Sequence, residues 1–180
     1  RGRFHSNKAF HLKGGPNVIL KPATDTDTTS DGAVIRFFGT EDSSQAMSAQ
    51  PVFGADQIAH SGGGTLVVGD IVRLWDSHVR PSDNQEVNKE LVKVREATNS
   101  GVTKIEGTIL SNQTAGTYTY TKLNTLKNIS IHDLKIELGT TSTVHGIWCY
   151  RAENVKVSNI HLTGGKGTSI RLQDTYNAHV

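Results

Sequence analysis

The 180-residue chain contains a single cysteine, Cys149, so it cannot form an internal disulfide bond and its fold does not depend on the redox compartment. No apolar run approaches the ~20 residues that a membrane-spanning helix needs, so we expect no membrane insertion. The 19 basic and 17 acidic side chains nearly balance, which excludes a strongly basic nucleic-acid-binding protein on composition alone. The sequence starts with Arg and shows no signal peptide.

Hydrophobic residues are also scarce, at 35% of the chain, and no segment shows a sustained helical period. In contrast, 47 of the 180 residues are Thr, Val or Ile, whose branched β-carbons favour strands. Short runs of alternating apolar and polar residues recur at 17–20, 33–38, 71–75, 91–95 and 102–106. The sequence therefore predicts an all-β protein.

The last third of the chain contains a repeat. Residues 127–131 (Lys-Asn-Ile-Ser-Ile) match 153–157 (Glu-Asn-Val-Lys-Val), and 176–180 (Tyr-Asn-Ala-His-Val) begin a third copy. The Asn of each copy recurs after 26 and then 23 residues. Two further matching strands, 145–150 and 168–173, precede the second and third copies. Each period thus holds three short strands separated by turns rich in Gly, Asn and Thr.

Three strands of about four residues in each period form a coil and not a flat sheet. Stacked coils pair their strands in parallel, about 4.8 Å apart, and alternate side chains fill the interior. We expect the Asn at each turn to bond backbone groups or to stack on the next Asn. The predicted interior residues are Ile129, Ile131, Leu134, Ile136, Ile147, Cys149, Val155, Val157, Ile160, Leu162, Ile170 and Leu172. The predicted outward residues are Lys135, Trp148, Tyr150, Lys156, His161, Arg171 and Gln173.

The repeat at 146–160 and 169–178 resembles the parallel β-helix repeat of the pectate-lyase-like superfamily. Residues 68–74, 91–94 and 102–106 resemble the early coils of phage tail-spike and appendage proteins. The resemblance implies a right-handed parallel β-helix that is a fragment of a longer chain. Residues 1–125 would form its N-terminal coils, with a loop excursion near 40–64 that holds a short helix or extra strands. Residues 126–180 would form regular coils, cut at the C-terminal end.

By function, the resemblance implies a tail-spike or appendage protein that acts outside the cell, in the virion tail, on a polysaccharide of the host cell surface. It implies a homotrimer that contacts other tail components, and no cofactor. Whether the chain is an enzyme stays open; an enzyme of this kind would be a polysaccharide depolymerase, either a glycoside hydrolase or a polysaccharide lyase. A structural or adhesive virion β-helix and a cellular polysaccharide lyase or epimerase are the alternatives.

The outward side chains of 145–151 and 168–174 form the candidate binding rows. They stack His145 on Thr168, Trp148 on Arg171, Tyr150 on Gln173 and Arg151 on Asp174. In related enzymes this strand carries the active face, so His145 is a candidate contact to substrate. Either Trp148 and Tyr150 stack on sugar rings, or they pack as aromatics under a loop. Either Arg151 and Arg171 bind a carboxylate or phosphate, or they pair with Asp174 or Glu153.

Asp174 is the candidate general acid, base or nucleophile, with Glu153 as a second carboxylate at its corner. Glycoside hydrolysis uses two carboxyl groups, ~5–5.5 Å apart for retention and ~6.5–9.5 Å apart for inversion. Only one carboxylate lies on this row, so we expect its partner to come from a missing coil or a neighbouring subunit. Cys149 is either a nucleophile or an apolar strand residue.

A metal site is not expected, because none of the eight His residues has zinc-motif spacing. The acidic run at 25–31 lacks the Gly and Glu of a calcium loop, so a turn is predicted there. The Gly-rich stretch 60–64 lacks the Lys of a phosphate loop. Formal glycosylation sequons begin at Asn112 and Asn128, and they would be accidental in a phage protein.

Overall fold

The computed structural model describes residues 10–15, 19–21, 32–60, 66–76, 89–97, 101–110, 117–140 and 143–180. The acidic run at 25–31, the Gly residues at 62–64 and the sequon at 112–114 lie outside these residues. Every regular element in the described part of the chain is a strand, as the sequence predicts. Among these residues there is no helix long and apolar enough to cross a membrane. The chain divides into two compact units, Arg1–Gly39 with Thr125–Val180, and Thr40–Asn124.

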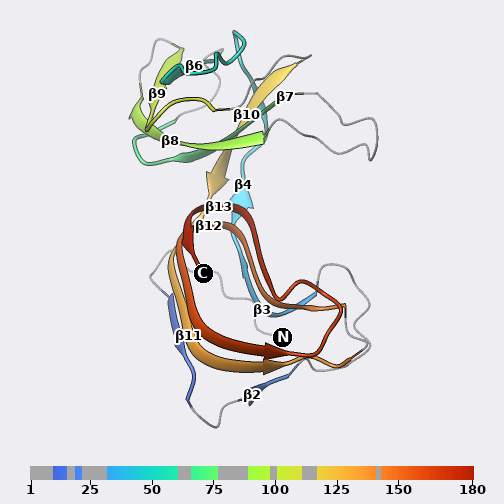
Figure 1. Ribbon diagram of the computed structural model, residues 1–180. Coiled ribbons are helices and arrows are strands. Elements are labelled where there is room, and N and C mark those ends of the chain that lie inside the picture. The colour runs from blue at the N-terminus through green and yellow to red at the C-terminus, as the bar shows by residue number, and fades with distance from the viewer. Residues whose placement is uncertain are drawn as a thin grey trace. The chain divides into compact units, whose positions relative to one another are not determined.

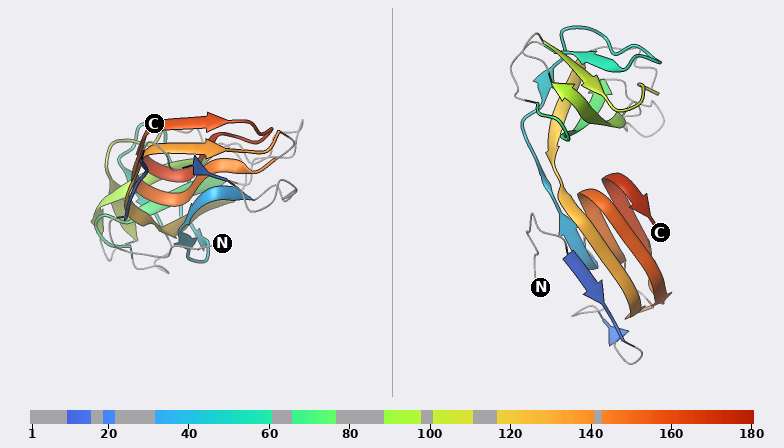
Figure 2. Two further views of the ribbon diagram at one scale, coloured as in Figure 1. Left: turned by 90° about the horizontal axis from the view of Figure 1, so that it is seen from below. Right: turned by 90° about the vertical axis from the view of Figure 1, so that its left-hand side faces the viewer.

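The first unit is a parallel β-helix. Its strands are β1 (Phe10–Lys13), β2 (Ile19–Leu20), β3 (Ala33–Phe38), β11 (Leu126–Glu137), β12 (His145–Thr163) and β13 (Ile170–His179). All of them pair in parallel: β11 with β1, β2 and β12, and β12 with β3 and β13, so that successive coils lie side by side (Figure 2, right). In Figure 1 the chain of this unit winds counterclockwise while later coils come nearer to the viewer, so the β-helix is right-handed.

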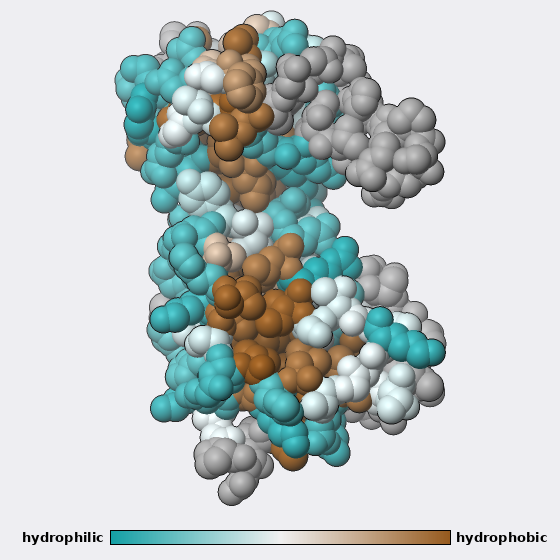
Figure 3. All heavy atoms as spheres, viewed as in Figure 1, coloured by the Kyte–Doolittle hydropathy of each residue, from teal (hydrophilic) through white to brown (hydrophobic). Residues whose placement is uncertain are grey.

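The interior of the β-helix consists of columns of apolar side chains, one from each successive coil. The register aligns Phe10 with Ile129, Val155 and Ala178, and Ile35 with Ile147 and Ile170. Every interior residue that the sequence predicts belongs to this core. At the last coil Ile160, Leu162, Ile170 and Leu172 are only partly buried, and Figure 3 shows apolar residues gathered inside the ring of strands.

The corners of the coil are made by residues in the left-handed backbone conformation. Asn128, Asn154 and Asn177 have φ values of 57°, 55° and 55°, a conformation that Asn tolerates better than most residues do. Their amides form the predicted ladder: Asn154 Nδ2 donates to Asn128 Oδ1 at 3.1 Å, and Asn177 Nδ2 donates to Asn154 Oδ1 at 2.7 Å. This ladder explains why Asn recurs in the sequence with the period of the coil.

The second unit has a different architecture. Its strands are β4 (Thr40–Glu41), β5 (Gln45–Ala46), β6 (Gln57–Ala59), β7 (Ile71–Asp76), β8 (Lys89–Ala97), β9 (Val102–Ile105) and β10 (Tyr118–Asn124). They pair antiparallel in the order β4-β10-β7-β8-β9-β6, with β5 on β10. Its core is Ile58, Leu66, Val72, Leu74, Val92, Val94, Ile105, Ile109 and Tyr120, drawn only from this unit.

The structure differs from the expectation for residues 40–125, whereas β1, β2 and β3 of the preceding residues do belong to the β-helix. Strands β7, β8 and β9, expected as early coils, form an antiparallel meander, and the short strands β4, β5 and β6 of the expected excursion at 40–64 belong to the same unit. The Gly-Asp phrase is a turn before β7: Gly69 has φ 90°, and the Asp70 carboxylate accepts a hydrogen bond from Val67 N at 2.9 Å. The alternation of apolar and polar residues is consistent with parallel coils and with an antiparallel sheet, because a strand that is buried on one face shows the same pattern in both.

The second unit is inserted at a corner of the β-helix. Phe38 pairs with Tyr150, and Leu126 pairs with Ala152. In the later coil a single residue, Arg151, separates Tyr150 from Ala152. In the earlier coil, the equivalent connection from Phe38 to Leu126 consists of Gly39 followed by residues 40–125. The ends of the insert are neighbours, because Thr40 of β4 pairs with Asn124 of β10.

We predict that deleting residues 40–125, so that Gly39 joins Leu126, leaves the β-helix folded. The junction restores the one-residue corner found in the next coil. Trp75 is removed with the insert, so fluorescence then reports Trp148 alone. We expect blue-shifted emission that a cooperative urea transition moves to the red.

The matched control for this deletion also removes Leu126 and Lys127. That change breaks the pairing of these two residues with Ala152 and Glu153, so we expect lower stability. Emission typical of exposed Trp in the first variant would show that the β-helix needs its insert.

Candidate functional site

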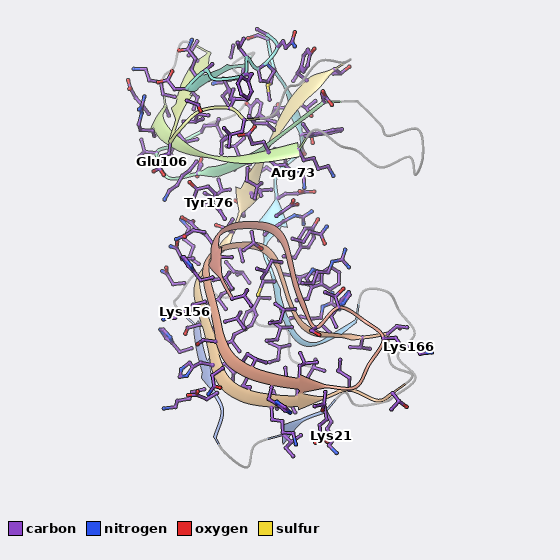
Figure 4. The ribbon with its side chains drawn as sticks, viewed as in Figure 1. Lys21, Arg73, Glu106, Lys156, Lys166 and Tyr176 are labelled. Carbon is purple, nitrogen blue, oxygen red and sulfur yellow. The ribbon has the colours of Figure 1, made fainter. Side chains whose placement is uncertain are left out.

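Three strands place a row of outward side chains on one side of the β-helix. The register aligns Arg36 of β3 with Trp148 of β12 and Arg171 of β13, and it aligns Phe38 with Tyr150. Because side chains alternate along a strand, the residues between them, such as Ile147, enter the core. We call this surface the aromatic–arginine face; it comprises Arg36, Phe38, His145, Trp148, Tyr150, Arg151 and Arg171. Figure 4 shows that Lys156, further along β12, also points away from the coil interior.

Trp148 lies at the centre of the aromatic–arginine face and is covered by its neighbours. Its side chain lies outside the coil as predicted, yet the residue is only 4% exposed. Phe38 packs on it edge to face at 4.7 Å between ring centroids, and His145 does so at 5.4 Å. The guanidinium carbon of Arg171 lies 4.5 Å from the centroid of the Trp148 ring, within cation–π range. Packing of the aromatic among its neighbours is therefore the arrangement that the structure adopts.

Tyr150 and Arg151 form a second pair on this face. The Arg151 guanidinium lies over the Tyr150 ring at 4.1 Å, and its Nη2 donates to Tyr150 Oη at 2.6 Å. Tyr150 is half-buried, and it lies 6.2 Å from Trp148 in a stacked arrangement. The two contacts to Arg151 hold the Tyr150 ring in one orientation, as a preformed ligand platform requires.

His145 is 7% exposed and has a neighbour at each ring nitrogen. The backbone N–H of Thr168 donates to Nδ1 at 3.1 Å, as the predicted stacking of these two residues requires. On the other side of the ring, Nη1 of Arg171 lies 3.2 Å from Nε2. The structure thus brings His145, Trp148 and Arg171 into one cluster.

The two candidate catalytic carboxylates lie at one corner of the coil. Glu153 is 3% exposed, and its Oε2 lies 3.4 Å from Lys127 Nζ and accepts a hydrogen bond from Thr125 Oγ1 at 3.4 Å. These contacts tie Glu153 to the preceding coil. Asp174 has φ 47° and, as predicted, occupies the same corner position as Arg151 one coil earlier. The catalytic roles of both carboxylates remain predictions.

Cys149 points into the core, between Phe37 and Leu172 in the neighbouring coils. Burial raises the pKa of its thiol to about 12, which keeps the sulfur protonated at neutral pH. The structure therefore favours the apolar-residue interpretation over a nucleophile. Among the described residues no group of three or more His, Cys, Asp or Glu side chains is arranged to hold a metal ion.

Sequence reasoning missed Arg36 and Phe38, which belong to the first coil. Their signal is present in hindsight: residues 35–38 (Ile-Arg-Phe-Phe) match 147–150 (Ile-Trp-Cys-Tyr) and 170–173 (Ile-Arg-Leu-Gln) in alternation. The insert separates the first match from the other two and hides the period. With Arg36, the face gains a second guanidinium near Trp148, 5.5 Å from the ring centroid.

Neither a protein-family model nor a curated protein matches this sequence. Solved structures do match its fold, and three of them are phage tailspikes. The gp54 tailspike of Acinetobacter baumannii bacteriophage AP22, solved in complex with A. baumannii capsular saccharide, has a TM-score of 0.75 and 16% identity, over 96% of this chain and 29% of that chain. The Pseudomonas phage phi297 tailspike gp61 has a TM-score of 0.61 and 17% identity, over 74% of this chain and 25% of that one.

The third structure is the tailspike protein gp49 from Pseudomonas phage LKA1. It has a TM-score of 0.58 and 17% identity, over 89% of this chain and 32% of that chain. The chain thus matches less than a third of the length of each of these tailspikes. At this level of identity the likeness establishes a tailspike-like β-helix fold.

Proposed function

We propose that this chain is part of a phage tailspike that binds a polysaccharide of the host cell surface through the aromatic–arginine face. The observation that carries the proposal is the register of Arg36, Trp148 and Arg171 on three stacked coils. The fold shared with three tailspikes supports it, as does the capsular saccharide bound to one of them. We further propose that the protein works in the tail of the particle, as a trimer with other tail components.

The geometry of the face suits an extended glycan. Coils repeat about every 4.8 Å along the axis, so equivalent side chains form a straight row with a fixed spacing. Half-buried Phe38 and Tyr150 offer ring surface that is already ordered, so little side-chain entropy is lost when a sugar ring packs on them. Guanidinium groups held over the rings add hydrogen-bond donors at defined positions.

Depolymerisation is the second part of the proposal, with Asp174 as one catalytic carboxylate and, for hydrolysis, a second from another coil or a neighbouring subunit. The role of Glu153 is then to hold the corner, because it is buried against Lys127 and Thr125. A non-catalytic adhesive β-helix is the alternative that this burial of Glu153 favours. Measuring the chain length of a bound polysaccharide after incubation distinguishes the depolymerase from the adhesin. Shorter products that disappear in an Asp174→Asn variant support the enzyme, and an unchanged chain length with binding retained supports the adhesin.

We predict that Tyr150→Ala weakens binding to the recognised polysaccharide at least ten-fold, because it removes the ring on which a sugar unit packs and the stacking contact that this ring makes with Arg151. Biolayer interferometry against a panel of purified capsular polysaccharides measures the effect. Lys156→Ala is the control, since Lys156 is exposed on another side of the same coil and its loss leaves the face intact. If the Tyr150 variant binds the polysaccharide as tightly as the unmodified protein does, the polysaccharide does not bind through the aromatic–arginine face.

A further inference from the structure

His145 is in contact with two hydrogen-bond donors, although a neutral imidazole accepts at only one nitrogen. The Thr168 donor is a backbone N–H fixed by the strand, and it donates to Nδ1. The imidazole proton then lies on Nε2, which faces Nη1 of Arg171 at 3.2 Å. If both ring nitrogens carried protons, the ring could accept a hydrogen bond neither from Thr168 N nor from Arg171 Nη1. Two donors therefore face each other at this point, with no acceptor between them.

The positive charge around this contact is not balanced within the described residues. Neither Arg36 nor Arg171 forms an ion pair there, and the contacts of both guanidinium groups are to aromatic or imidazole rings. The indole N–H of Trp148 is buried and has no hydrogen-bond partner. Within the described residues, the cluster thus joins the guanidinium groups of Arg36 and Arg171 with the N–H groups of His145 and Trp148, and no acidic side chain pairs with either guanidinium group. Burying such donors without partners costs free energy, which a ligand that accepts from them recovers.

We propose that Arg171, His145 and Trp148, with Arg36 beside them, form a subsite for an oxyanion carried by the glycan, a carboxylate or a phosphate. The oxyanion accepts from His145 Nε2 and from the Arg171 guanidinium, so it replaces a donor–donor contact with two charge-assisted hydrogen bonds. The proposal rests on the proposed function and narrows its substrate class to acidic polysaccharides. Arg171 and Arg36 are only partly buried, which leaves the subsite open to a substituent of a long polymer.

A small probe tests the subsite without knowledge of the natural glycan. In a Trp75→Phe background Trp148 is the only tryptophan, so its fluorescence and its indole N–H resonance report on the subsite. We titrate sodium glucuronate, inorganic phosphate and glucose. We expect a saturable shift of the Trp148 signals with glucuronate or phosphate, and which of the two binds tighter identifies the oxyanion. Glucose is expected to give no shift. No saturable shift with either anion, or an equal shift with glucose, overturns the subsite.

Variants then assign the effect to the named side chains. We expect Arg171→Gln to raise the Kd of the better anion at least ten-fold and Arg171→Lys to raise it less, whereas Lys156→Gln changes nothing. Arg36→Gln is a second variant at the edge of the cluster. An independent readout is the nitrogen spectrum of His145, in which we expect the Nε2–H tautomer; the Nδ1–H tautomer would overturn the proposal.

The polysaccharide panel keeps the two proposals distinguishable. If this protein binds a neutral polysaccharide and shows no response to glucuronate or phosphate, the subsite is refuted while polysaccharide binding stands. If the anions bind at Arg171 but no polysaccharide does, the subsite stands as an anion site and the proposed function fails.

Discussion

Replacing Ile147 by alanine is expected to lower the free energy of unfolding of the β-helix unit by about 2–5 kcal/mol. Ile147 is 0% exposed and lies in an interior column between Ile35 and Ile170. Its strand is hydrogen-bonded to β3 on one side and β13 on the other. The walls of the resulting cavity are therefore held in place, so the coil collapses little into the lost volume.

Urea unfolding followed by Trp148 fluorescence measures this effect. The Trp75→Phe background is used again, because Trp75 lies in the second unit and Trp148 in the first, so the signal then belongs to the β-helix alone. Ile147→Val is the matched control and is expected to cost about 0.5–1.5 kcal/mol. A loss below about 1 kcal/mol for the alanine variant would mean that the column repacks, contrary to our account of a rigid coil.

The second large effect is expected from Gly164→Ala, with a loss of about 2–5 kcal/mol of stability. Gly164 has φ 75°, and a β-carbon there would lie 2.0 Å from the backbone oxygen of Leu138 in the preceding coil. That oxygen cannot move freely, because Leu138 N donates to Thr163 O at 2.8 Å and so holds the two coils together at this turn. The variant combines an unfavourable backbone conformation with a clash against the backbone.

Two other glycines separate these contributions. Gly165→Ala has nearly the same φ, 79°, but its β-carbon meets the Leu138 side chain, which can shift. Gly107→Ala in the second unit has φ 77° and open space around it, so it shows the cost of the conformation alone, about 1–2 kcal/mol. Urea unfolding followed by Trp148 fluorescence measures Gly164→Ala and Gly165→Ala. For Gly107→Ala the same experiment is done in a Trp148→Phe background, in which Trp75 is the reporter. If Gly164→Ala costs no more than Gly107→Ala, the close approach of the two coils is not rigid.

The β-helix could be predicted from the sequence because one physical rule repeats along it. Each strand needs apolar residues at alternate positions, and each corner needs a residue that tolerates positive φ, so Asn128, Asn154 and Asn177 mark the period. Parallel stacking follows once the period is seen. The second unit shows no such period, and its alternating strands are consistent with parallel coils or an antiparallel meander. The pairing that decides between them, such as Ile71 with Lys93, is not encoded in a short motif.

For the candidate site, the sequence predicted the positions on the repeat but not their surroundings. The outward positions of Trp148, Tyr150 and Arg171 follow from alternation. The burial of Trp148 does not, because it depends on Phe38 and Arg36, which belong to a coil on the other side of the insert. The burial of Glu153 likewise depends on Lys127 and Thr125 of the preceding coil. Side chains that meet across coils are the part that a linear pattern cannot supply.

The corner insertion has a consequence for the order of folding during translation. Strand β1 is synthesised before residues 40–125, yet its partner β11 follows them. At the usual rate of synthesis, residues 40–125 take roughly 4–17 s. The second unit draws its core only from its own strands, so we expect it to fold during this interval. Once the second unit has folded, it holds Thr40 beside Asn124. The entropic cost of bringing the first two coils together is then that of closing a short loop and not one of 86 residues.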